Sequence, residues 1–84
     1  MERGLMAQYF FDMVGIDEDD IGSNFESAGD ARNAAIVYLG EYLRDEPGYA
    51  TQGHWQVDVY DDSRTLLFNV VVSTVDARAV RALA

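Results

Sequence analysis

Cysteine is absent from the 84 residues, which excludes disulfide bonds, thiolate metal sites and thiol catalysis. Basic residues are scarce, because six Lys and Arg stand against fifteen Asp and Glu and leave a formal net charge of −9. Lys and Arg supply most of the affinity for nucleic acids and for anionic membranes, so this balance argues against both partners. No apolar run approaches the roughly 20 residues that span a bilayer, and the N-terminus lacks signal-peptide features. We therefore expect a cytoplasmic protein with no cofactor, nucleic-acid or membrane partner.

The length and composition indicate one small folded domain over residues 1–84. Hydrophobic residues make up 49% of the chain, which is too much for a disordered acidic tail. A chain this short forms only a small hydrophobic core. Because it has no disulfide bonds, its stability depends on good packing or on a partner chain. Residues 1–5 and 77–84 are expected to be frayed, and Met6 is an alternative start because the regular pattern begins there.

Hydrophobic periodicity predicts four strands and one helix. Apolar residues alternate along 6–14 and 54–60, and β-branched residues dominate 65–75; residues 23–26 form a short candidate strand. Helical spacing over 27–46 begins at Ser27, a candidate N-cap, with Pro47-Gly48 as the stop signal. The order predicts an α+β fold: an antiparallel sheet of three to four strands in β-β-α-β-β order, with one helix packed on one face. Trp55 and Tyr38 are expected in the core. A last helical turn over 76–83 is an alternative to fraying there.

Two blocks of residues resemble a known family. The first is Tyr9-Phe10-Phe11-Asp12 with Asp20, Gly22 and the alanine-rich helix start at 30–35; the second is Val57 and Val59 leading to Asp61-Asp62. Together they resemble a family of short, uncharacterised bacterial proteins grouped as a domain of unknown function, over residues 8–72. The chain departs from that pattern at Gln8, where arginine is usual, and at Ser63 or Arg64, where a turn glycine is usual. The resemblance implies the fold and no particular activity.

The acidic run at 17–20 is a candidate cation site, because Ca²⁺ and similar ions need several oxygen ligands at once. Its weak candidate ligands are Asp17, Asp19 and Asp20. Aligned with an EF-hand loop, Asp19 and Gly22 fit, whereas Ile21 and Ala28 occupy ligand positions and a strand precedes the loop. A solvated connection is the simpler interpretation.

Catalysis ranks last among the functions considered. His54 is the sole histidine, and Asp58, two strand repeats further along, is roughly 13 Å away and out of contact. The sequence contains no Ser-His-Asp order, Gly-rich phosphate loop or Cys-His arrangement. We therefore predict no catalytic residues.

The sheet face opposite the helix is half apolar, whereas a solvated face is normally polar. Such a surface is typical of a partner site, so we predict a small, non-catalytic interaction module, homodimeric through this outer face or an edge strand. A second possibility is that the C-terminal segment, with Val80 and Leu83, folds back over the face; another protein is a third. The predicted interaction surface comprises Phe10, Tyr60, Leu67, Val71 and Val75.

Overall fold

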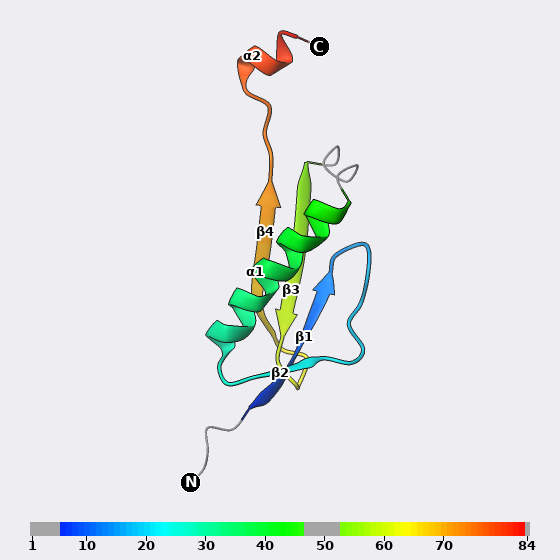
Figure 1. The fold of residues 1–84 in the computed structure, drawn as a ribbon, viewed down its shortest axis with the longest axis vertical. Helices are drawn as coiled ribbons and strands as arrows, with labels where there is room; N and C mark the ends of the chain where they lie inside the picture. Colours follow the sequence, from blue (N-terminus) through cyan, green and yellow to red (C-terminus); the bar gives the residue numbers. More distant parts are fainter. Residues whose placement is uncertain (1–5, 47–52, 84) are drawn as a thin grey trace.

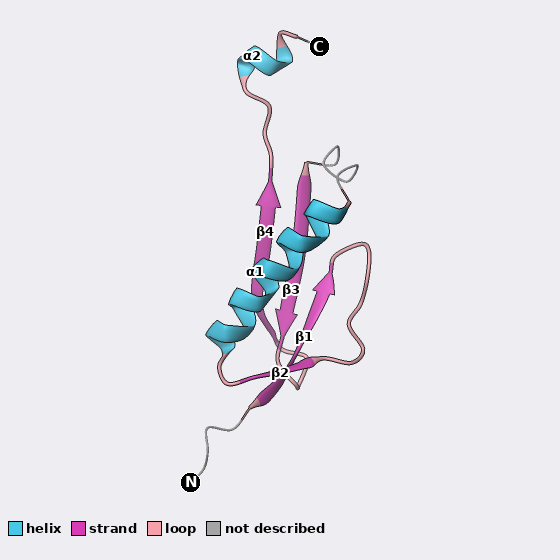
Figure 2. Cartoon of the chain, in the orientation of Figure 1, coloured by secondary structure: helices cyan, strands magenta, loops and turns pink. Residues whose placement is uncertain are grey.

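A computed structural model describes residues 6–46 and 53–83. Its elements, drawn in Figure 1 and Figure 2, confirm the predicted β-β-α-β-β order and the α+β class. They are β1 (Ala7–Met13), β2 (Ser23–Phe25), α1 (Ala28–Asp45), β3 (His54–Tyr60), β4 (Leu66–Ser73) and a short terminal α2 (Arg78–Arg81).

The four strands form one antiparallel sheet in the spatial order β2-β1-β3-β4. Phe10 pairs with Tyr60 between β1 and β3, and Asp58 pairs with Asn69 between β3 and β4. Because directly paired residues share a face, Asp12, Asp58 and Asn69 form a polar row across the outer face.

The helix α1 crosses one face of the sheet diagonally (Figure 1). It begins where expected, since the Ser27 hydroxyl accepts a hydrogen bond from the Asp30 backbone N–H at 3.0 Å. It ends at Asp45; Pro47-Gly48, the predicted stop signal, lies outside the described residues.

The core lies between α1 and the two central strands. Every second residue of β3 is buried, namely Trp55, Val57 and Val59. Trp55 is 4% exposed, as predicted. Tyr38 is only partly buried, because it packs at the margin of the core, with its ring 6.3 Å from that of Phe11. The buried residues are Tyr9, Met13, Ala31, Ala35, Leu39, Trp55, Val57 and Val59.

The strand β4 contributes no fully buried residue. A register shift between Val59 and Tyr60 places Tyr60 opposite Leu66, so the strand does not hold one alternation over its whole length. Phe68 and Val70 pack against the edge of the core, whereas Leu66, Leu67, Val71 and Val72 are exposed.

The C-terminal segment does not fold back over the outer face, so that alternative is wrong. The chain leaves β4 after Ser73 and carries α2 beyond the end of the sheet, away from the other elements (Figure 1). Val75 and Leu83 are 86% and 85% exposed. The outer face therefore receives no cover from this part of the chain.

Leu39→Ala tests the core. Leu39 is fully buried, so its truncation leaves a cavity and should lower the free energy of unfolding by about 2–5 kcal/mol. Val37→Ala, at an exposed position of the same helix, should change it by less than about 0.5 kcal/mol. Urea unfolding followed by tryptophan fluorescence measures both, and equal losses would contradict the described core.

Candidate functional site

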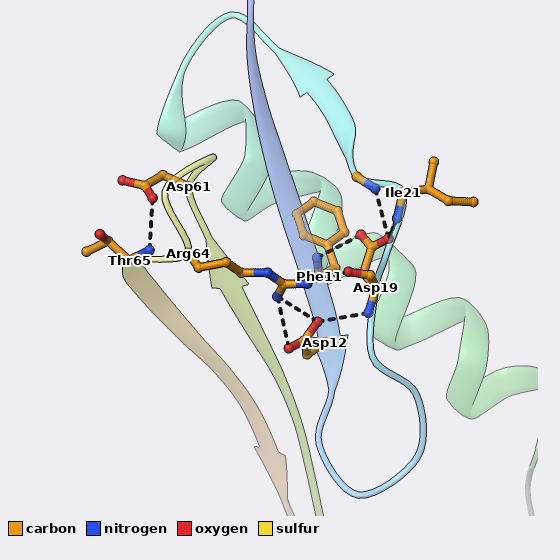
Figure 3. Close-up of polar contacts among 8 residues, drawn as sticks. Phe11, Asp12, Asp19, Ile21, Asp61, Arg64 and Thr65 are labelled. Atoms are coloured by element: carbon orange, nitrogen blue, oxygen red, sulfur yellow. Dashed lines mark hydrogen bonds and ion pairs between the residues drawn. The ribbon is translucent and has the colours of Figure 1, made fainter.

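The acidic loop after β1 is closed by its own carboxylate, Asp19. Its Oδ2 accepts a hydrogen bond from Phe11 N at 3.0 Å, and its Oδ1 accepts from Ile21 N at 3.1 Å and Gly22 N at 2.9 Å (Figure 3). Partial burial raises the pKa of Asp19, but these three donors and the charge of Arg64 outweigh it, so the pKa is lowered overall. The carboxylate thus fastens the loop to β1.

Arg64 ties the same loop to the opposite end of the sheet. Its Nη1 lies 3.2 Å from Asp12 Oδ2, and its Nη2 donates to the Asp19 backbone oxygen at 2.5 Å (Figure 3). Its guanidinium also lies over the Phe10 ring at 4.4 Å and the Tyr60 ring at 5.3 Å. Asp12 completes the connection by accepting from Asp19 N at 2.9 Å.

Arg64 has φ +63°, a left-handed conformation that favours glycine. Arg64 is one of the two alternatives, with Ser63, for the position at which the family resemblance implies a turn glycine. The hairpin around it is closed by Asp61, whose Oδ1 accepts from Ser63 N and Thr65 N at 2.9 Å each. The sequence did not predict the contacts of Arg64 with Asp12 and Asp19. The only available signal was that Arg64 is the lone basic residue between Asp45 and Asp76.

A polar ladder continues across the outer face. Asp58 Oδ1 accepts from Gln56 Nε2 at 2.6 Å and from Asn69 Nδ2 at 2.7 Å. His54 Nε2 lies 3.4 Å from Gln56 Oε1 at the exposed end of the row. These side chains pair with one another, so the centre of this face is hydrogen-bonded and polar.

The structure divides the five residues of the predicted interaction surface between the two sides of the Asp58–Asn69 pair. Phe10 and Tyr60 lie side by side beneath Arg64 and are partly buried. Leu67 lies on the same side of the Asp58–Asn69 pair as these two rings, at the register shift beside the Tyr60–Leu66 pairing, whereas Val71 lies opposite Gln56 on the other side and Val75 lies past the end of β4. Only Leu67 and Val71 share one element, and that element is an edge of the sheet.

The candidate metal ligands flank an open groove of about 490 Å³ between the acidic loop and α1. Asp19 already accepts three backbone hydrogen bonds, and Asp17 and Asp20 are exposed. Within residues 6–46 and 53–83, no three His, Cys, Asp or Glu side chains gather closely enough to hold a metal ion. The groove is lined by Phe11, Asp17, Glu18, Asp19, Asp20, Ile21, Ser23 and Tyr38.

The fold defines a small α+β domain whose antiparallel sheet has the short β2 at one edge and the longer β4 at the other. The chain belongs to the family described as Domain of unknown function (DUF6894), whose profile matches residues 8–73. Neither the curated proteins nor the solved structures include a significant match to this chain. No helix in the described part of the chain is long and apolar enough to cross a membrane.

Asp19→Asn should lower stability at neutral pH, because an amide replaces a carboxylate that accepts three backbone N–H groups. The folded pKa of Asp19 lies below its unfolded value near 3.9, so its contribution is present above that value and lost as pH falls through the lowered pKa. Urea unfolding should show a gap between wild type and variant at pH 7 that closes towards pH 2. Asp20→Asn, at an exposed position, should show little gap at either pH; a pH-independent gap for Asp19→Asn would contradict this role.

Comparing Arg64→Gly with Arg64→Ala separates the loss of the side-chain contacts from the effect of the left-handed backbone conformation. Both variants lose the Asp12 ion pair and the ring contacts, but only alanine keeps a Cβ at φ +63°. Thermal unfolding should therefore find the alanine variant less stable than the glycine variant by about 1 kcal/mol. An alanine variant at least as stable as the glycine variant would contradict the assigned conformation.

Proposed function

We propose that this protein is a small, non-catalytic interaction module that forms a homodimer through the free edge of β4. One observation carries the proposal: β4 is an eight-residue edge strand, Leu66–Ser73, that contains no charged residue and no proline. Natural edge strands are usually short, charged, bulged or covered, because an open row of backbone groups invites pairing with another chain.

The backbone of β4 offers such a row. Thr74 N donates to Gly53 O at 2.9 Å, so Thr74 faces β3. Because N–H groups alternate in direction along an antiparallel strand, those of Asn69, Val71 and Ser73 point away from β3. A second strand paired with this edge would satisfy these donors and the matching carbonyl groups.

Side chains along the same edge favour burial. Leu67 is 36% exposed and Val71 47% exposed, and Leu66 and Val72 are exposed to a similar degree. Burial of apolar surface stabilises association by roughly 25 cal/mol per Å², and a thin core gains most from such an addition. A second copy suits this edge because two-fold pairing of one strand with itself is self-complementary.

The outer face is a weaker candidate for the interface. Its central row of Gln56, Asp58 and Asn69 is internally hydrogen-bonded, so a partner there would cover polar groups that already have partners. A cation-responsive acidic loop, the other function considered from the sequence, has no comparable observation in its favour. His54 contacts Gln56 at the rim of the face, which suits a non-catalytic role.

The proposal predicts a solution mass of twice the 9.4 kDa chain at micromolar concentration. Leu67→Glu and Val71→Glu each place a carboxylate on β4 and should shift the equilibrium to monomer. Ile21→Glu, the matched control, makes the same change at an 82% exposed position on the acidic loop and should stay dimeric. Sedimentation equilibrium distinguishes these states.

Two results would contradict the proposal. One is a wild-type chain that sediments as a monomer, which would leave the edge to a different partner. The other is a dimer whose mass is unaffected by either β4 substitution while both variants remain folded by circular dichroism.

A further inference from the structure

The helix α1 lies close to the open edge of the sheet. Its first turns reach β4, as Figure 1 shows, and the Arg32 guanidinium lies 5.7 Å from the centre of the Phe68 ring on that strand. On the other side of the helix, the Tyr38 ring lies 6.3 Å from the Phe11 ring of β1. These two contacts establish which flank of α1 faces the β4 edge.

The flank of α1 on the β4 side carries a large apolar side chain beside an open space. Because residues three and four apart are neighbours on a helix surface, Ile36 and Gly40 follow Arg32 along this flank. Ile36 is 52% exposed. A Cβ atom added at Gly40 would meet no other side chain within 4 Å among the described residues.

This flank also carries no carboxylate. The acidic residues of α1, namely Asp30, Glu41 and Asp45, lie on the other flank, towards Tyr38. The whole chain has a formal net charge of −9, so two copies repel each other except where carboxylates are absent from the contact. The β4-side flank and β4 itself, which contains no charged residue, together form such a region.

Pairing along β4 alone gives only a thin contact between two copies. Two strands held by each other and nothing else are marginally stable in water. A specific interface usually buries more than about 1,000 Å² of surface. The dimer proposed above therefore needs a second layer of contact beyond the backbone hydrogen bonds of the two strands.

Antiparallel pairing of β4 places this second layer between the two helices. A two-fold axis perpendicular to the sheet at its edge keeps both helices on one side of the joined sheet and makes them antiparallel. The β4-side flanks then face each other. A residue above the axis on one helix meets a residue below the axis on the other. When the axis passes between Ile36 and Gly40, each Ile36 side chain therefore fills the space over the partner's Gly40.

We propose that the two α1 helices pack against each other in the dimer, with Ile36 of one copy in contact with the partner's Gly40. This inference rests on the proposed function, because it requires the β4 edges to be paired. It gives a physical role to Gly40, which costs an exposed helix about 1 kcal/mol relative to alanine. The contact occurs twice, so the two-fold symmetry is satisfied by one large and one small residue from each chain.

Gly40→Leu separates the helix contact from folding. Leucine favours the helix, and the space over Gly40 is open within one chain, so the dilute monomer should unfold at a temperature at least as high as that of wild type. In the dimer the new side chain would occupy the place of the partner's Ile36. The dissociation constant from sedimentation equilibrium should therefore rise at least about tenfold. Glu41→Leu, the matched control, adds the same side chain at an exposed position on the other flank and should not weaken the dimer.

Exchange of the two residue sizes tests their contact directly. Ile36→Ala removes apolar surface from both copies of the contact and should weaken the dimer roughly tenfold. Val37→Ala, at a 59% exposed position that faces away from the sheet, is its matched control and should leave the dissociation constant unchanged. The double variant with Ile36→Ala and Gly40→Leu again pairs a large residue with a small one, and it should recover most of the affinity.

The outcomes separate this inference from the proposed function. A wild-type monomer overturns both. A dimer that is weakened by Val71→Glu but is unaffected by Gly40→Leu overturns the helix contact and leaves β4 pairing in place. Two weakened single variants with no recovery in the double variant overturn the pairing of Ile36 with the partner's Gly40.

Discussion

A single helix has to cover a four-stranded sheet, and it is too narrow to do so. An α-helix with its side chains is roughly 10–12 Å across, while neighbouring strands lie about 4.8 Å apart, so one helix covers two strands well. The buried residues accordingly come from α1, β1 and β3, and none comes from β4. On β4 the helix covers Phe68 and Val70 in part, whereas Leu67 and Val71 lie on the opposite face and stay exposed. The apolar sequence of β4 is suited to cover from outside the chain.

The two edges of the sheet differ in how they are protected. At one edge, β2 has three residues, and the acidic loop that leads to it is held by Asp19 and Arg64. At the other edge, β4 has eight uncharged residues and continues into a projecting arm. A sheet with one protected and one open edge favours a closed dimer over a growing fibre, because pairing of the open edges leaves only protected ones.

The sequence was sufficient to predict the secondary-structure elements and their order. The alternation of apolar residues along 54–60 and the helical spacing from Ser27 are strong local signals. Trp55 followed from the same alternation. The sequence did not predict the partial exposure of Tyr38, which depends on where the helix crosses the sheet, or the register shift opposite Leu66. The contacts of Arg64 with Asp12 were also missed, since they join residues 52 positions apart. The five predicted interaction residues were assigned to one face, and hydrogen bonds of Asp58 divide that face in a way that residue spacing does not reveal.

The central claim, that a second copy covers β4, is tested most directly by amide hydrogen exchange resolved by residue at high and low protein concentration. The N–H groups of Asn69, Val71 and Ser73, which point away from β3, should exchange slowly in concentrated protein and quickly on dilution. Those of Val70 and Val72, bonded within the sheet, should change much less. Fast exchange at Asn69, Val71 and Ser73 at every concentration would contradict the account.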